Sequence, residues 1–156
     1  MCAHWHLFTD GSVNPHSRVG YGACLWLQEF TAPTDLITRT VTVKRFEATS
    51  STKLELQTLI WSLHEHLASA KKQTIEITVY TDSQNIINLP GRRVRLERDD
   101  YFSRNKKQLK HHQLYHLHFK LVKVQGHQPS GNRDLIAQHF SLVDQAARQA
   151  LRADTL

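Results

Sequence analysis

The chain has 156 residues, of which 40% are hydrophobic and 22% are charged, and its formal net charge is +6 at pH 7. This size and composition predict one globular domain over residues 1–156, with a hydrophobic core of its own. No apolar run approaches the roughly 18 residues of a membrane span, and the N-terminus does not resemble a signal peptide. The only cysteines, Cys2 and Cys24, form neither a disulfide framework nor a zinc motif. We therefore expect a cytoplasmic protein that does not interact with membranes.

The first part of the chain predicts three consecutive strands. Trp5–Thr9 is an apolar run, and the polar segment Gly11–Gly20 predicts a turn. A second strand is predicted over Gly20–Leu27, where glycines allow close approach of another backbone. Leu36–Phe46 alternates polar and apolar residues, which is typical of a half-buried strand. The short connections favour an antiparallel meander.

The hydrophobic period then changes to that of a helix. Leucines recur at helical spacing from about Thr52 to Ala68, after the N-cap candidates Thr49–Thr52. Glu55 falls in the first turn of this predicted helix, where a glutamate usually caps the helix or interacts with its dipole. The strand that follows, Ile75–Thr81, should run parallel to the first strand because a helix connects them in a right-handed crossover.

The last part of the chain predicts a short helix, a fifth strand and a long helix. The short helix covers Ser83–Leu89, and His112–Tyr115 predicts a helical turn. Alternating residues predict a strand over Leu117–Val124. Gln125–Asn132 is expected to be a loop, and an apolar stripe predicts a final helix over about Asp134–Arg152.

Two of the predicted strands end in the same pattern, Thr-Asp followed by a small polar residue. Asp10 is followed by Gly11, and Asp82 is followed by Ser83. If these strands are parallel neighbours, both carboxylates lie at the carboxyl edge of the sheet, where open α/β sheets bind ligands. Close carboxylates repel each other unless a cation lies between them, and oxygen ligands suit Mg²⁺ or Mn²⁺. Each aspartate alone would be explained equally well as a cap, but the repetition favours a metal site.

Basic residues are concentrated in one segment. Ten of the twenty lysines and arginines lie between Arg92 and Lys123, together with only three acidic residues. Such a run can be a solvated surface, but beside a predicted metal site it favours a nucleic-acid partner, because clustered cations neutralise phosphates. Arg92, Arg93 and Arg95 are therefore candidate substrate-binding residues.

Six short motifs, in this order, resemble type 1 ribonuclease H, and they cover nearly the whole chain. They are Phe8-Thr9-Asp10-Gly11-Ser12, Gly20-Tyr21-Gly22-Ala23, Lys53-Leu54-Glu55-Leu56, Tyr80-Thr81-Asp82-Ser83-Gln84, Gly126-His127 and Val143-Asp144-Gln145-Ala146-Ala147-Arg148. The resemblance implies the catalytic domain alone, with an α/β ribonuclease H-like fold. That fold has a five-stranded mixed sheet with helices on both faces. Its first three strands are antiparallel, and its fourth and fifth are parallel to the first.

The resemblance also implies an activity. Members of this family are endonucleases that cut the RNA strand of an RNA/DNA hybrid and leave 5′-phosphate ends. We therefore expect a monomeric enzyme that uses two Mg²⁺ ions, for which Mn²⁺ can substitute. Hydrolysis of a phosphodiester needs an activated water and a stabilised leaving oxygen, which two ions about 3.5–4 Å apart can provide.

Residue by residue, the resemblance implies a set of catalytic and metal-binding positions. Asp10, Glu55, Asp82 and Asp144 match the four carboxylates that bind the ions, and His127 matches a histidine that assists proton movement or product departure. Further positions match residues that contact the substrate: Asn14, Ser50, Ser51, Thr52 and Gln84. Glu55 is also a candidate for sensing the RNA 2′-hydroxyl.

The fourth carboxylate has a competitor, because Asp134 also follows His127. At about 100° per residue, Asp134 falls roughly 150° from the centre of the apolar stripe of the final helix. It is expected in the first turn of that helix, facing solvent as a dipole partner. Asp144 falls roughly 70° away, at the border of the stripe, where its side chain can reach the sheet edge. Both this geometry and the family motif favour Asp144.

The chain departs from the family pattern in three places. Ser51-Thr52 stands where the family often has a pair of asparagines, so hydroxyls must make these contacts or they are absent. The segment between Asp82 and His127 leaves little room for the extra helix of longer relatives. The spacing of seventeen residues from His127 to Asp144 is longer than usual.

Two other classes of function remain open at this point. The same fold also supports other nucleases and strand-transfer enzymes, although the Glu55 motif argues against them. A non-catalytic nucleic-acid-binding module is the second alternative. The carboxylates argue against it, because a protein that only binds phosphate gains nothing from an acidic cluster.

Overall fold

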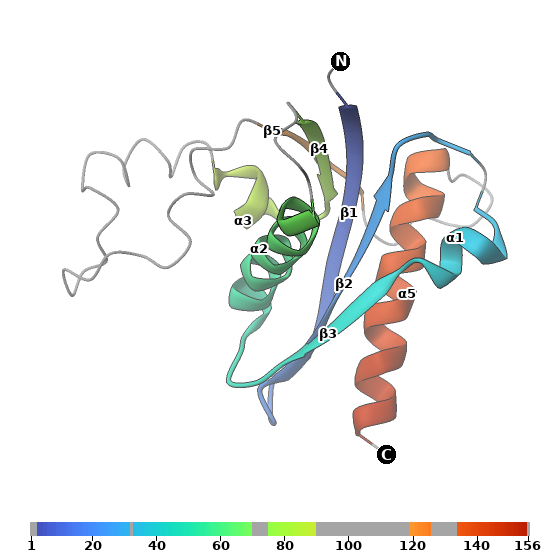
Figure 1. Ribbon diagram of the computed structural model, residues 1–156. Helices are drawn as coiled ribbons and strands as arrows, with labels where there is room; N and C mark the ends of the chain where they lie inside the picture. The colour runs from blue at the N-terminus through green and yellow to red at the C-terminus, as the bar shows by residue number, and fades with distance from the viewer. Residues whose placement is uncertain (1–2, 32, 70–74, 90–118, 126–133, 156) are drawn as a thin grey trace, which may run out of the picture.

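The computed structural model describes residues 3–31, 33–69, 75–89, 119–125 and 134–155. Within these residues, five strands form one mixed sheet in the order β3-β2-β1-β4-β5 (Figure 1). The strands are β1 (Ala3–Asn14), β2 (Val19–Leu27), β3 (Thr42–Phe46), β4 (Ile75–Thr81) and β5 (Phe119–Lys123). The first three pair antiparallel, whereas β4 pairs parallel with β1 and β5 parallel with β4. The fold class predicted from the sequence is confirmed.

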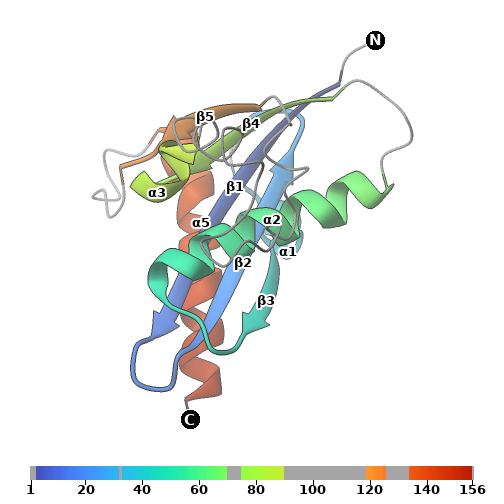
Figure 2. The same cartoon turned by 90° about the vertical axis from the view of Figure 1, so that its left-hand side faces the viewer.

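Helices cover both faces of this sheet. The helices are α1 (Asp35–Arg39), α2 (Ser51–Ser69), α3 (Gln84–Ile87) and α5 (Leu135–Asp154). Figure 2 shows α2 in front of the sheet and α5 behind it. Successive residues of a strand point to opposite faces, so Leu7 joins the core beneath α2 while Phe8 joins the core beneath α5.

Helix α2 lies close to the sheet because three glycines, Gly11, Gly20 and Gly22, lie beneath it on β1 and β2. A Cβ atom at Gly22 would lie 2.1 Å from Thr58 Oγ1, and one at Gly11 would lie 2.9 Å from Leu54 Cδ2. These glycines allow the first turns of α2 to rest on β1 and β2. The same contact brings Glu55, the residue after Leu54, toward the sheet edge that carries Asp10.

The predicted strand Leu36–Phe46 is wrong in its first half. Thr34 caps α1, because its Oγ1 accepts a hydrogen bond of 3.2 Å from the Ile37 nitrogen, and only Thr42–Phe46 forms a strand. Ile37 and Val41 suggested a period of two residues, but a spacing of four fits a helix equally well. Both side chains pack against the core beneath α5.

The bounds of the other elements differ less from the predicted ones. The first four residues of the predicted turn Gly11–Gly20 belong to β1, which pairs with β2 as far as Asn14, and its last two residues belong to β2. Helix α2 begins at Ser51, so Glu55 lies in its second turn rather than its first. Asp134 is the N-cap of α5 rather than part of its first turn, and the short helix shrinks to α3. The predicted helical turn at His112–Tyr115 and all of the predicted loop except Gln125 lie outside the described residues.

None of the helices in the described parts of the chain combines the length and the apolar character that crossing a membrane requires.

Candidate active site

The parallel pairing of β1 and β4 brings Asp10 and Asp82 to the same edge of the sheet. Phe8 pairs with Tyr80 in this ladder. Asp10 lies two residues after Phe8, and Asp82 lies two residues after Tyr80. The two aspartates therefore reach the sheet edge at the same level. Alternation along β1 places Asp10 on the face that α5 covers, with Phe8. The sequence pattern predicted this meeting of the two carboxylates.

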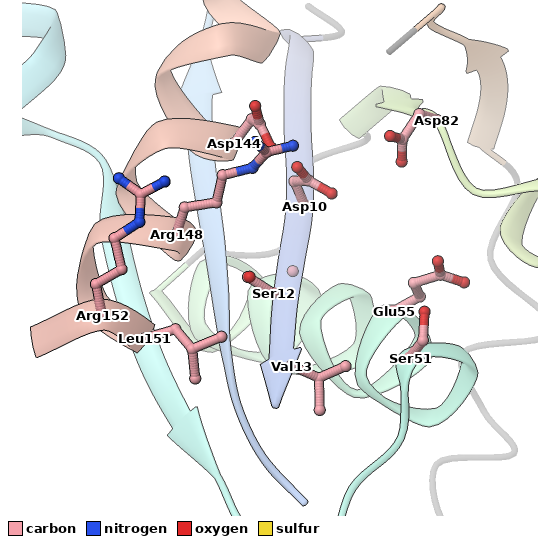
Figure 3. A pocket seen from close by; sticks show the side chains of 11 residues that line it. Asp10, Ser12, Val13, Ser51, Glu55, Asp82, Asp144, Arg148, Leu151 and Arg152 are labelled. Carbon is pink, nitrogen blue, oxygen red and sulfur yellow. The ribbon is translucent and has the colours of Figure 1, made fainter. Parts of the chain in front are cut away.

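The helices on the two faces supply two more carboxylates. Asp144 follows the buried Val143 on α5, and Glu55 follows the buried Leu54 on α2. All four acids line one open cleft of about 500 Å³ (Figure 3). The cleft is lined by Asp10, Gly11, Ser12, Val13, Ser51, Glu55, Asp82, Asp144, Arg148, Leu151 and Arg152. Four elements that are distant in sequence thus meet at one site.

The pKa of Asp10 is raised, and the surroundings of this side chain explain the shift. Burial raises the pKa of Asp10, the charge of Asp82 and a hydrogen bond with Asp144 raise it further, and the resulting pKa is about 8. A backbone hydrogen bond from Gly11 opposes these effects only in part. In the absence of a cation, this carboxyl therefore holds its proton more strongly than an ordinary aspartate does.

The other carboxylates have specific hydrogen-bond partners. Arg148 Nε donates to Asp144 Oδ1 at 2.9 Å, between residues one helical turn apart. Ser83 Oγ donates to Glu55 Oε2 at 2.5 Å, and Asn85 Nδ2 donates to the same oxygen at 3.4 Å. Asp144 and Glu55 are therefore oriented by side chains that are themselves anchored on helices.

The donor set suits a divalent cation, although the carboxylates are spread out. Among the described residues, no three side chains of Asp, Glu, His or Cys are grouped tightly enough to hold one ion. The site nevertheless consists of carboxylate oxygens, which are the ligands that hard ions such as Mg²⁺ prefer. Burial raises the pKa of Asp10 most, and the neighbouring charges of Asp82 and Asp144 raise it further. A divalent cation would neutralise these charges, so the residues present fit the ion.

The predicted substrate-binding residues lie in different places. Ser51 lines the cleft, whereas Ser50 and Thr52 line a neighbouring pocket of about 240 Å³ between α2 and α3. Gln84 is exposed at the start of α3, where its Oε1 accepts a hydrogen bond of 2.7 Å from Lys123 Nζ. Asn14 Oδ1 accepts from the backbone nitrogens of two residues in the turn after β1. His127, Arg92, Arg93 and Arg95 lie outside the described residues.

Sequence reasoning missed the basic residues of the cleft. Arg148 and Arg152 line it from α5, four and eight residues after Asp144. That spacing places all three side chains along one face of a helix, and this was the signal that could have found them. Ser83 was also assigned no role beyond starting the short helix.

Comparison with known proteins agrees with this arrangement. The chain matches the RNase H family over residues 3–152. It is also similar to the crystal structure of the native protease-reverse transcriptase of prototype foamy virus, with a TM-score of 0.65 and 16% sequence identity. The similarity covers 93% of this chain and 20% of the viral one, so the chain spans about a fifth of that protein's length. It shows a shared fold.

No curated protein matches the sequence. The family match nevertheless extends over almost the entire chain, including all four acids of the cleft. The chain therefore belongs to the ribonuclease H family.

Proposed function

We propose that this chain hydrolyses the RNA strand of RNA/DNA hybrids with divalent ions, Mg²⁺ or Mn²⁺, held by Asp10, Glu55, Asp82 and Asp144. The observation that carries the proposal is the convergence of these four carboxylates in one open cleft. An acidic cluster repels a phosphodiester backbone, so it suits hydrolysis of that backbone only together with cations. When bound, two such ions would activate a water molecule and stabilise the leaving oxygen.

The chain's own residues would orient the ligands of these ions. Asp10 interacts with both Asp82 and Asp144, so it is the residue best placed to be shared between two ions. Arg148 and Ser83 fix the carboxylates of Asp144 and Glu55 through hydrogen bonds. The role of His127 in proton movement or product departure stays a prediction from the family motif.

The two sides of the cleft would contact different groups of the substrate. Figure 3 shows Arg148 and Arg152 on one side and Glu55 and Ser51 on the other. Among the described residues that line the cleft, only the two arginines are positively charged. We assign them to RNA phosphates. The hydroxyl of Ser51 and the carboxylate of Glu55 can exchange hydrogen bonds with a 2′-hydroxyl, the group that distinguishes RNA from DNA.

The test is cleavage of labelled RNA/DNA, RNA/RNA and DNA/DNA duplexes in Mg²⁺, with a parallel reaction in excess chelator. We expect only the RNA strand of the hybrid to be cut, with 5′-phosphate ends and only when the ion is present. Asp82→Asn should reduce the rate by more than roughly 100-fold, since loss of a ligand should exceed the loss caused by altering its hydrogen-bond partners.

Glu76→Gln is a matched control, because Glu76 lies on β4, the strand that leads to Asp82, and its side chain is exposed. Undiminished cleavage in chelator would refute the metal mechanism, and equal cleavage of hybrid and RNA/RNA would refute the substrate assignment. A monomeric state and a cytoplasmic location remain predictions, which size-exclusion chromatography and fractionation of the source cells would check.

A further inference from the structure

Ser83 connects two of the cleft's carboxylates, although it takes no direct part in the proposed reaction. It directly follows Asp82 and is 5% exposed. Its Oγ donates to Glu55 Oε2 at 2.5 Å and accepts from the Ile86 nitrogen at 3.3 Å. A serine hydroxyl has one proton to donate. The bond to the Ile86 backbone uses a lone pair, so that proton is committed to Glu55.

The position of the hydroxyl is held by its surroundings. The Ser83 backbone nitrogen donates to Thr81 Oγ1 at 3.0 Å, which fixes the turn that carries Asp82. Thr81 and Ile86 are 3% and 2% exposed, and Ile86 belongs to the core beneath α2. The turn between β4 and α3 is therefore anchored on both sides of Asp82. The Ser83 hydroxyl is therefore a hydrogen-bond donor at a fixed position relative to Glu55.

The two oxygens of the Glu55 carboxylate are used differently. Ser83 and Asn85 both donate to Oε2. Oε1 has no hydrogen-bond partner among the described residues. Glu55 lines the cleft from α2 (Figure 3). One oxygen is therefore used for orientation, while the other remains available to a ligand in the cleft.

We propose that Ser83 is a positioning residue that holds the Glu55 carboxylate in the cleft and couples it to the turn carrying Asp82. The inference rests on the proposed function, because it concerns how these two carboxylates are presented together to a divalent ion. It goes further in identifying the α2–α3 contact as the determinant of that geometry. Partners that orient metal ligands typically contribute about 10- to 100-fold to metal affinity or activity.

A purely structural role is the competing explanation, because Ser83 is also the N-cap of α3. Three substitutions separate the two roles. Ser83→Ala removes both the cap and the bond to Glu55. Ser83→Gly removes the hydroxyl but preserves most of the capping, since glycine is tolerated nearly as well as serine at an N-cap. Ser83→Thr retains a hydroxyl for both contacts.

The experiment measures Mg²⁺ binding to the substrate-free protein by NMR titration, together with KM and kcat for hybrid cleavage. We expect Ser83→Gly and Ser83→Ala to weaken Mg²⁺ binding about 10- to 100-fold. They should lower kcat with little change in KM, and Ser83→Thr should behave as the unaltered protein. Ser62→Ala is the matched control. It removes another buried hydroxyl, on α2, that donates to a backbone carbonyl.

The outcomes distinguish this inference from the proposed function. Normal Mg²⁺ affinity and kcat in Ser83→Gly would overturn the positioning role and leave Ser83 only as a cap. An unaltered protein that binds no Mg²⁺ would overturn it as well. An unaltered protein that binds Mg²⁺ but cuts no hybrid would refute the proposed function, while weakened Mg²⁺ affinity in Ser83→Gly would still support the positioning role.

Discussion

At the scale of single residues, the chemistry of the cleft depends on neighbours that the sequence places far away. Asp10 illustrates this dependence, because burial and two acids from other elements raise its pKa to about 8. Such a group favours the protonated form in the folded chain and the ionised form in the unfolded chain. This arrangement lowers the stability of the cation-free protein. Such a loss is expected at a site that is selected for ligand binding rather than for stability.

The raised pKa predicts a pH-dependent stability in chelator. The folded pKa of Asp10 lies above its ordinary value of 3.8, so the folded state binds more protons between the two pKa values. The free energy of unfolding should therefore fall as the pH rises from about 4 to about 8. Asp10→Asn removes this contribution. We expect its melting temperature to exceed that of the unaltered protein by a margin that grows from pH 5 to pH 8.

Asp35→Asn serves as a control, because Asp35 is exposed in the first turn of α1, outside the cleft. Thermal melts monitored by circular dichroism would give the comparison. A margin for Asp10→Asn that stays constant over this pH range would show that the Asp10 carboxyl is not perturbed. Mg²⁺ should stabilise the unaltered protein more than it stabilises the Asp10→Asn variant.

The two aspartates of the final helix should differ sharply on substitution. Asp144 lines the cleft, whereas Asp134 is exposed and its Oδ1 accepts from the Ala137 nitrogen at 2.8 Å. Asn is as good an N-cap as Asp, so Asp134→Asn should cost little. Asp144→Asn should reduce Mg²⁺-dependent cleavage of the hybrid by more than roughly 100-fold. The reverse result would mean that the metal site on this helix is misplaced.

At the scale of elements, the seating of α2 on the sheet determines where Glu55 lies. The contact depends on the absence of a side chain at Gly22, directly beneath Thr58. Helix α5 makes a different contact, through a row of buried side chains against the opposite face: Ala137, His139, Phe140, Val143 and Ala147. The cleft opens where the two helices approach the same sheet edge from opposite faces.

Gly22→Ala should displace α2 from the sheet. The added Cβ would lie 2.1 Å from Thr58 Oγ1 and 2.9 Å from two other atoms of that side chain. Overpacking of this kind typically costs about 1–3 kcal/mol. We therefore expect a lower melting temperature and slower hybrid cleavage, since Glu55 moves with the helix. Denaturant unfolding would give the stability change.

Thr58→Ala provides the matching test. Combined with Gly22→Ala, it removes two of the three clashing atoms, so part of the lost stability should return. A double-mutant cycle with both single variants measures this coupling. Strictly additive effects would contradict the close contact between α2 and β2.

At the scale of the whole molecule, the protein has to attract a polyanionic substrate although its cleft is acidic. The net charge of +6 attracts nucleic acid over a longer range than the cleft repels it. Near the carboxylates, Arg148 and Arg152 lie on the α5 side. Of the basic segment from Arg92 to Lys123, the described residues include Lys120 and Lys123, and the contribution of the segment stays a prediction.

The arginines of α5 should account for part of the salt dependence of hybrid binding. Fluorescence anisotropy in chelator measures binding without cleavage. Replacing Arg148 and Arg152 by Gln should lower the slope of log K against log salt, by roughly 0.9 for each phosphate that is no longer neutralised on a B-form duplex. Arg39→Gln with Lys44→Gln is the control pair, because both side chains are exposed outside the cleft. An unchanged slope would show that the arginines of α5 do not contact phosphates.

The same measurement can test the basic segment. Replacing Arg92, Arg93 and Arg95 by Ala should weaken binding and flatten the salt dependence in the same way. A slope equal to that of the unaltered protein would place these side chains away from the substrate.

Sequence alone determined the features that depend on local pattern. The apolar runs that end in Thr-Asp predicted β1 and β4, and their common edge, because strand-helix-strand connections have one hand. The apolar stripe on the final helix and the family motif both selected Asp144 over Asp134. The pattern was wrong in the first half of Leu36–Phe46. Ile37 and Val41 fit both the two-residue period of a strand and the period of a helix, and the Thr34 cap stabilises a helix there.

The tertiary structure alone decided which distant side chains touch. The bond from Ser83 to Glu55 joins residues 28 positions apart, and its existence depends on how α2 sits over Gly11 and Gly22. The pKa of Asp10 likewise depends on Asp82 and Asp144, which approach it from β4 and α5. Hydrogen bonds and charge interactions act over a few ångströms, whereas a sequence pattern records only spacing along the chain. Local periodicity could therefore indicate the elements and the acids, but only packing could establish which residues orient them.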